Sequence, residues 1–197
     1  PTMLPAPEPE TAGLVLGSYE LISPLARGAM GEVWRARHRS SGSLLAVKCL
    51  REAPDEWARS AFEMEVRATA GLHHPGIVMV LDHGEIDAAA SASSAGRLPA
   101  GSPYLVMELV DGRPLQSHVG RLSWPHIQDL LLQLLDALSH SHARGVIHRD
   151  LKPGNVLLSA AADGALRTRI TDFGLAQAVD QGATHERIVA GTPAYMA

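Results

Sequence analysis

The chain has 197 residues, of which 46% are hydrophobic and 19% are charged, and its formal net charge is -4. Such a composition is typical of a globular domain with an apolar core, and it gives no electrostatic reason to expect binding to nucleic acid or to an anionic membrane. A single cysteine, Cys49, excludes a disulfide within the chain and fits a reducing compartment. The sequence has no run of 18 apolar residues and no signal-peptide pattern, so neither a membrane-spanning helix nor a cleaved leader is expected.

The first half of the chain predicts mostly strands. Residues 1–16 are Pro-rich and acidic, which is typical of a linker or tail. Apolar alternation, turn residues and helical spacing then predict, in order, strands over 19–26, 31–38 and 43–50, a helix over 56–72, and strands over 78–81 and 104–110. The low-complexity Ala/Ser/Gly stretch over 87–103 predicts a flexible surface loop between the last two strands.

The second half of the chain predicts mostly helix. Ser123, Trp124 and Pro125 are a helix start signal, and apolar residues keep helical spacing from there to Gly145. Short strands are expected over 156–158 and 169–171. The order of elements therefore predicts an α+β fold with a β-rich first lobe and a helical second lobe.

Three features of the β-rich half are typical of phosphate binding, although each also has an ordinary structural explanation. Gly28 and Gly31 let backbone N–H groups approach a polyphosphate, but two glycines in a turn usually mean only a turn. Lys48 lies in an apolar strand, where its ammonium needs an anion or counter-charge unless the side chain reaches the surface. Glu65 on the next helix is a candidate partner for Lys48, or simply part of a solvated helix face.

Two later motifs are more specific. Residues 148–155 read HRDLKPGN and place a potential base, two cations and an amide ligand in one loop after a helix. Residues 172–174 read DFG and follow a short strand, so that the Asp172 carboxylate can present its oxygens to a metal without crowding.

Taken in order, the motifs resemble the signature set of protein kinases: a glycine-loop variant over 26–33, AVK over 46–48, HRDLKPGN, DFG, and GTPAYMA over 191–197. The resemblance runs from Tyr19 to Ala197 and is to Hanks-type (eukaryotic-like) serine/threonine kinases of bacterial type. It implies a two-lobed protein-kinase-like fold with a β-rich N-lobe containing one helix and an incomplete α-helical C-lobe. The expected domains are a linker or tail (1–16), the N-lobe (17–110, with the flexible insertion 87–103) and a partial C-lobe (111–197).

The resemblance implies that the protein transfers the γ-phosphoryl group of ATP to serine or threonine hydroxyls of proteins. Lys48 would hold the α- and β-phosphates and pair with Glu65, whose distance to His74-Pro75 fits the family better than that of Glu63. Asp150 would orient the substrate hydroxyl and accept its proton, and Lys152 would neutralise charge on the transferred group.

The same resemblance assigns ligands for metal and nucleotide. Asn155 and Asp172 would hold Mg²⁺, with Mn²⁺ as an alternative, because both metals accept hard oxygen ligands. The expected nucleotide-contacting residues are Leu25, Gly28, Gly31, Val33, Ala46, Lys48, Met107, Glu108 and Val110. Among these, Glu108 and Val110 would bind adenine through backbone groups, and Met107 would guard the back pocket.

The sequence departs from the family pattern in two ways. The leading loop glycine is Ala26 here, which would cost about 1 kcal/mol if the backbone there needed positive φ. The family pattern also continues past Ala197, so we expect an incomplete catalytic domain whose isolated activity is in doubt.

Rival functions remain open. A non-catalytic nucleotide-binding pseudokinase or scaffold is disfavoured because Lys48, Asp150, Asn155 and Asp172 are all present. A small-molecule phosphotransferase is disfavoured by HRDLKPGN and GTPAYMA. The expected partners are ATP and protein substrates, without nucleic acid or membrane contact from this segment, and the expected location is the cytoplasm. Thr184 is the candidate site of autophosphorylation, with Arg149 as its phosphate-binding partner.

Overall fold

The computed structural model describes residues 13–28, 31–50, 63, 66–67, 69–95 and 97–173. The chain forms two compact units, which are treated separately below. Unit 1 comprises Pro1–Pro54 and Leu81–Leu109, and unit 2 comprises Asp55–Val80 and Val110–Ala197. The lobe boundaries expected from the sequence stay predictions.

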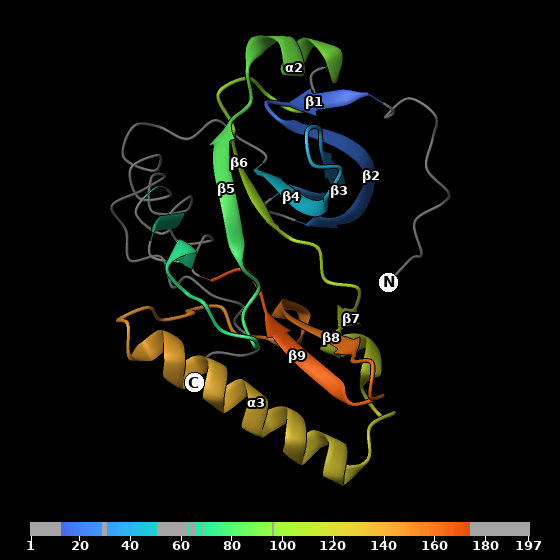
Figure 1. Cartoon of the computed structure of the whole chain (residues 1–197), viewed down its shortest axis with the longest axis vertical. Coiled ribbons are helices and arrows are strands. Elements are labelled where there is room, and N and C mark those ends of the chain that lie inside the picture. The colour runs from blue at the N-terminus through green and yellow to red at the C-terminus, as the bar shows by residue number, and fades with distance from the viewer. Residues whose placement is uncertain are drawn as a thin grey trace. The chain divides into compact units, whose positions relative to one another are not determined.

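Unit 1 is built on a six-stranded sheet with the order β1-β2-β3-β4-β6-β5 (Figure 1). Its elements are β1 (Leu14–Leu16), β2 (Tyr19–Gly28), β3 (Gly31–His38), β4 (Leu44–Leu50), β5 (Val80–Glu85), α2 (Ala88–Ser93) and β6 (Pro103–Glu108). The pairs β2–β3, β3–β4 and β4–β6 are antiparallel. The run LLAVKCL forms β4 between β3 and β6, and every residue of this strand after Leu44 is buried.

One face of this sheet carries the apolar core of unit 1. Trp34, Val47 and Val106 on successive paired strands are fully buried there. Leu14 and Leu16 of β1 cover the same core, together with Ala90 of α2. Residues 14–16 were expected to belong to a linker or tail, which is wrong. They pair with β2 as strand β1, and burial of Leu14 and Leu16 stabilises this extension of the sheet.

The Ala/Ser/Gly insertion also differs from expectation. A loop was expected over 87–103, but residues 88–93 form the helix α2, whose N-cap is the Asp87 side chain. The sequence pattern did not predict this helix, because its small residues form no apolar stripe. The helix is nevertheless favourable, because alanine has the highest intrinsic helix propensity.

Unit 2 contains one long helix, α3 (Trp124–His142), and a three-stranded sheet with the order β7-β8-β9. The remaining elements are β7 (Arg113–Pro114), η2 (Leu115–His118), η3 (Pro153–Asn155), β8 (Val156–Ala160) and β9 (Leu166–Ile170). Helix α3 begins after Ser123 as predicted, and Gly145 with φ of +74° lets the chain turn away after its end. Leu134 and Ala137 of α3 pack against Ile170 of β9 to form part of a small core.

Some predicted strands are displaced. β5 covers 80–85 rather than 78–81, because the Val78 N–H donates instead to the Ile170 carbonyl (2.8 Å). β9 covers 166–170 rather than 169–171 and pairs with β8 over five positions. β7 and η2 were not predicted, since two- to four-residue elements leave no periodic pattern.

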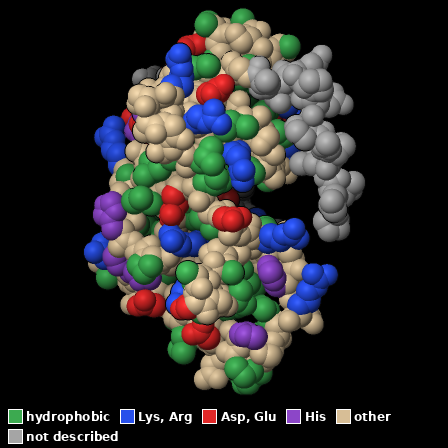
Figure 2. Space-filling view, turned by 45° about the vertical axis from the view of Figure 1, so that its right-hand side comes forward, with side chains coloured by type: hydrophobic (Ala, Val, Ile, Leu, Met, Phe, Trp, Pro, Cys, Tyr) green, Lys and Arg blue, Asp and Glu red, His purple; other side chains and the backbone are tan. Residues whose placement is uncertain are grey.

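Surface charge is mixed. On the face shown in Figure 2, acidic and basic side chains of the described residues alternate rather than gather by sign. Among the described helices none is both long and apolar enough to cross a bilayer.

Candidate active site

Four of the expected nucleotide-contacting residues of unit 1, namely Val33, Ala46, Lys48 and Met107, lie on one face of its sheet. Residues paired across antiparallel strands point to the same face. Val33 pairs with Lys48, and Ala46 pairs with Met107, so all four share the face opposite Trp34 and Val47. The sheet therefore presents small and apolar side chains beside one lysine, as a flat purine ring next to phosphates requires.

The glycine-containing hairpin shows why glycine is needed at one position and not at the other. Gly31 has φ of +149°, and a Cβ there would collide with the Cys49 carbonyl oxygen of β4. Gly28 has open space where a Cβ would stand, so packing alone does not require glycine at this position. Ala26 of β2 pairs with Val33 of β3, and its φ is not positive. The backbone penalty considered for Ala26 therefore does not arise.

Lys48 is buried, with 6% of its surface exposed, in the middle of β4. A buried ammonium must be compensated by an anion or hydrogen-bond acceptors. Its expected partner Glu65 lies outside the described residues, so that pairing stays a prediction. Met107 and Ala46 are buried beside each other, whereas Leu25 sits at an irregularity of β2 and is 42% exposed.

Glu108 ends β6, and Val110 follows it; both are partly buried. Their backbone contacts with adenine stay predictions.

The loop over residues 148–155 of unit 2, which carries the HRDLKPGN motif, is held by its own polar side chains. The Lys152 ammonium lies 2.7 Å from one Asp150 carboxylate oxygen, Oδ2. The Asn155 amide nitrogen donates to the same Oδ2 (3.1 Å) and to the Asp150 carbonyl (2.9 Å). Three residues that the sequence placed within one motif are thus brought into direct contact, with the carboxylate at the centre. Both donors meet the same carboxylate oxygen, which fixes the orientation of the Asp150 side chain.

His148 ties this loop to the strand that leads to the DFG motif. Its Nε2 lies 2.9 Å from the Thr171 carbonyl, and because a carbonyl only accepts, Nε2 carries the proton. The Asp150 N–H donates to the unprotonated Nδ1 (3.3 Å). Burial lowers the pKa of His148, which keeps this neutral form, while the bond to Thr171 opposes the shift. His148 also packs against the Phe173 ring, with centroids 4.6 Å apart.

Asp172 and Arg149 share an unusual backbone. Both have positive φ, +61° and +64°, a conformation that costs non-glycine residues free energy and is often found at functional sites. The Thr171 N–H, next to Asp172, donates to the Asn155 carbonyl (2.9 Å), so the two expected metal ligands belong to hydrogen-bonded segments.

The residues present fit a magnesium ion. The Asn155 amide nitrogen donates to Asp150, so the Asn155 atom that would bind the metal is Oδ1. Asp172 would add a carboxylate. Amide and carboxylate oxygens are the ligands that Mg²⁺ prefers.

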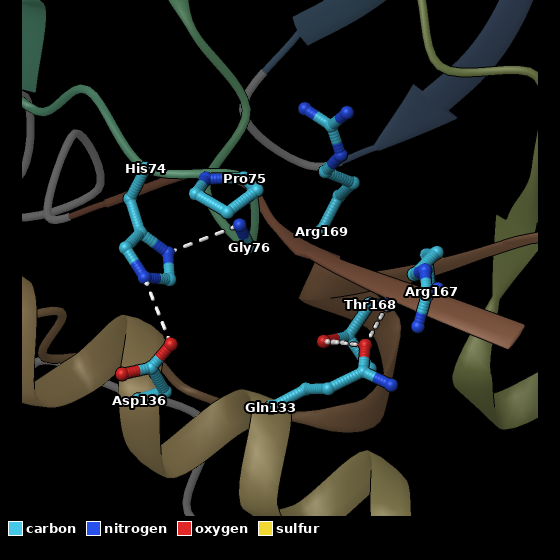
Figure 3. Close-up of a pocket in the computed structure, with 8 residues that line it drawn as sticks. All are labelled: His74, Pro75, Gly76, Gln133, Asp136, Arg167, Thr168 and Arg169. Atoms are coloured by element: carbon cyan, nitrogen blue, oxygen red, sulfur yellow. Dashed lines mark hydrogen bonds and ion pairs between the residues drawn. The ribbon is translucent and has the colours of Figure 1, made fainter.

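Two further groups support the site, and sequence reasoning missed them. The Gln133 carboxamide of α3 accepts from the Thr168 N–H (2.9 Å) and donates to the Leu166 carbonyl (3.0 Å), which fixes β9 on the helix. His74 lies 3.1 Å from Asp136 of α3 and accepts from the Gly76 N–H (3.0 Å). Figure 3 shows Gln133 with Thr168, and His74 with Asp136 and Gly76, lining one pocket of unit 2. A lone glutamine on a helix carries no sequence signal for such a role.

Comparison with known proteins identifies the family. The protein kinase domain model matches residues 19–197. This chain belongs to the protein kinase family. Serine/threonine-protein kinase PknA of Mycobacterium tuberculosis is 41% identical over 195 residues, which are 96% of this chain and 42% of the relative. Serine/threonine-protein kinase Pkn1 of Myxococcus xanthus is 38% identical over 190 residues, 94% of this chain and 26% of the relative.

Solved kinase structures agree. The Mycobacterium tuberculosis PknI kinase domain is similar with a TM-score of 0.66 and 30% identity, over 88% of this chain and 64% of that one. The predicted kinase-like α+β fold and the resemblance to bacterial serine/threonine kinases are therefore confirmed. The chain spans less than half the length of the curated relatives PknA and Pkn1.

Proposed function

We propose that the protein containing this chain transfers the γ-phosphoryl group of ATP to serine and threonine hydroxyls of other proteins. The observation that carries the proposal is the Asp150 carboxylate, fixed by Lys152 and Asn155 in a family whose relatives are named serine/threonine-protein kinases. A carboxylate held in one orientation suits a group that orients a hydroxyl and accepts its proton.

The roles follow from the chemistry of each side chain. Asp150 orients the substrate hydroxyl and takes up its proton as the hydroxyl oxygen bonds to the γ-phosphorus and the bond from that phosphorus to ADP breaks. The Lys152 ammonium, 2.7 Å from that carboxylate, neutralises charge on the phosphoryl group. Lys48 binds the α- and β-phosphates and pairs with Glu65.

Asn155 and Asp172 would hold the metal. A bound Mg²⁺ supplies positive charge to the phosphate oxygens. We propose Mg²⁺ rather than Mn²⁺ as the working ion, which activity titrations with each metal will decide. The nucleotide would contact Leu25, Gly28, Gly31, Val33, Ala46, Met107 and Glu108 on the sheet of unit 1, and Val110 after the end of β6.

Lys48→Met tests the proposal in the whole protein. The methionine removes the ammonium but keeps the length and apolar stem of the side chain, so the fold should persist. Transfer of labelled phosphate from ATP to a generic protein substrate should then disappear, while the melting temperature changes little. Undiminished transfer by the variant would overturn the assignment.

The pseudokinase alternative predicts a different pattern. Such a protein would bind nucleotide with Lys48 intact and transfer no phosphate under any metal.

Autophosphorylation at Thr184 is proposed as the regulation of this activity. Thr184 lies outside the described residues and is the only hydroxyl residue between Gly174 and Gly191. A phosphate there adds about -1.5 to -2 charge, which a guanidinium such as that of Arg149 binds in a bidentate manner. Mass spectrometry of the active protein should find phosphate on Thr184. Thr184→Ala and Arg149→Ala should each lower activity, with losses that do not add, because both remove one interaction.

We also propose a cytoplasmic location for the catalytic part, because its co-substrate ATP is found there. Fractionation of cells with an antibody against this segment tests the location.

A further inference from the structure

The insertion between β5 and β6 is a folded cap on unit 1. Its two ends are closed by hydrogen bonds from the Ile86 N–H to the Ser102 carbonyl (2.9 Å) and from the Gly101 N–H to the Ile86 carbonyl (2.8 Å). Leu98, only 2% exposed, inserts into the core beneath it. In Figure 1 the cap is seen as α2 lying beside β1.

The turn after α2 is fixed by one serine. Ser94 is buried, and its hydroxyl donates to the Ser91 carbonyl (2.7 Å) and accepts from the Leu98 N–H (3.0 Å). The Arg97 N–H donates to the Ser94 carbonyl (3.1 Å). These hydrogen bonds fix the backbone of Arg97 and Leu98 to Ser94, so Arg97 has a defined position.

Arg97 reaches from the cap to strand β3. Its guanidinium carbon lies 5.3 Å from the centroid of the buried Trp34 ring, which is a cation–π distance. Its Nη2 lies 3.6 Å from the Glu32 oxygen Oε2. This oxygen is buried and has no hydrogen-bond partner among the described residues, so the charge of Arg97 compensates an otherwise costly carboxylate oxygen.

Glu32 connects the cap to the glycine-containing hairpin. Its second oxygen, Oε1, lies 2.9 Å from Nε of Arg27, which pairs with Glu32 across the two strands. Arg27 directly precedes Gly28, and Glu32 directly follows Gly31. One carboxylate is thus shared by two arginines, one in the hairpin and one in the cap.

We propose that Arg97 is a positioning residue for the nucleotide-binding hairpin: it holds Glu32, and through Glu32 it holds the β2–β3 strands at the base of the hairpin. Glu32 and Trp34 occupy the face opposite Val33 and Lys48, so Arg97 acts without touching the nucleotide. The proposal rests on the proposed function in so far as this hairpin binds ATP. It makes the cap, which composition predicts to be a flexible loop, a determinant of nucleotide affinity.

The test compares Arg97→Ala, Arg97→Lys and the control Arg39→Ala in the whole protein. Arg39 is an exposed arginine in the β3–β4 turn of the same unit, so its loss changes the net charge equally. The first measurement is amide hydrogen exchange over residues 25–34 without nucleotide, which does not depend on kinase activity. Arg97→Ala should speed exchange there, Arg97→Lys should restore most of the protection, and Arg39→Ala should change nothing.

The second measurement separates KM for ATP from kcat. Arg97→Ala should raise KM about two- to fivefold, the range expected for a partly exposed ion pair with a cation–π contact, and leave kcat within about twofold. Glu32→Gln should also raise KM, and the loss in the double variant should be smaller than the sum of the two single losses, because the Arg97–Glu32 pair that both substitutions remove can be lost only once.

Three results would overturn the proposal: unchanged hydrogen exchange in Arg97→Ala, an equal effect of Arg39→Ala, or fully additive losses with Glu32→Gln. A lower melting temperature with unchanged exchange and unchanged KM would show a merely structural residue. Failure of the wild-type protein to bind ATP would instead refute the proposed function and leave the exchange result to stand on its own.

Discussion

The sheet of unit 1 and the 148–155 loop of unit 2 hold their candidate functional side chains in place by different means. On the sheet, Val33, Ala46 and Met107 are placed by the backbone ladder, and none needs its neighbour's side chain to stay in register. In the loop, Asp150, Lys152 and Asn155 hold one another through their polar atoms. Changes on the sheet face should therefore act locally, whereas a change in the loop should disturb several functional groups at once.

The largest effect is expected in the loop. Asp150→Asn keeps the shape of the side chain but removes the base and the charge that Lys152 pairs with. Phosphoryl transfer should fall about 10²- to 10⁴-fold, the usual contribution of a positioned general base. Affinity for ATP, measured by calorimetry, should change much less. Equal losses of transfer and of nucleotide binding would show that the loop and the sheet face do not divide the work in this way.

Substitutions on the buried apolar face of the sheet should lower the stability of the fold, with no direct effect on phosphoryl transfer. Trp34 is fully buried in the core of unit 1. Trp34→Ala should lower the free energy of unfolding by about 3–5 kcal/mol, as truncation of a buried aromatic does. Denaturant titration followed by circular dichroism measures this loss. Trp34→Phe is the matched control and should cost clearly less, since it leaves a smaller cavity. A loss below about 1 kcal/mol for alanine would contradict the assigned core.

A pH-dependent prediction concerns His148. Its pKa in the folded protein is below the ordinary value, mainly because of burial, so unfolding takes up a proton as the pH falls through about 6.5. The wild-type protein thereby loses stability on acidification, whereas His148→Phe does not titrate at this position. At pH 7.5 the variant should be about 1–3 kcal/mol less stable, because the Thr171 carbonyl loses its donor.

The difference between wild type and His148→Phe should shrink at pH 5.5, and the other histidines cancel in the comparison. Thermal or urea unfolding at the two pH values provides the measurement. A difference that stayed constant or widened would mean that His148 is charged in the folded state.

The smallest effect concerns Cys49 on the sheet. Burial, with a smaller contribution from the Glu32 carboxylate, raises the pKa of this thiol to about 12, and only 2% of the residue is exposed. Since the thiolate is the reactive form, alkylation by iodoacetamide at pH 8 should be slow in the native protein and rapid in concentrated guanidinium. Mass spectrometry of the peptide that contains Cys49 reports the extent. Rapid native labelling would indicate that this part of the core opens frequently.

Local sequence determined much of this protein. The strand β3 over 31–38 and the start of α3 after Ser123 were predictable, because alternation, glycine and proline act over a few residues. The family was also predictable, since HRDLKPGN and DFG are short contiguous motifs. Contiguity likewise predicted that Asp150, Lys152 and Asn155 lie in one loop, where the structure shows them in contact.

Only the tertiary structure decided how distant segments support these motifs. Gln133 and Thr168 are 35 residues apart, and nothing in the sequence around either predicts their hydrogen bond. The same is true of Arg97 and Glu32, because the cap in which Arg97 lies reads as low complexity, and its buried Leu98 is a single apolar residue without a pattern. Motifs are local, but the burial and charge pairing that hold them in place depend on which segments the fold brings together.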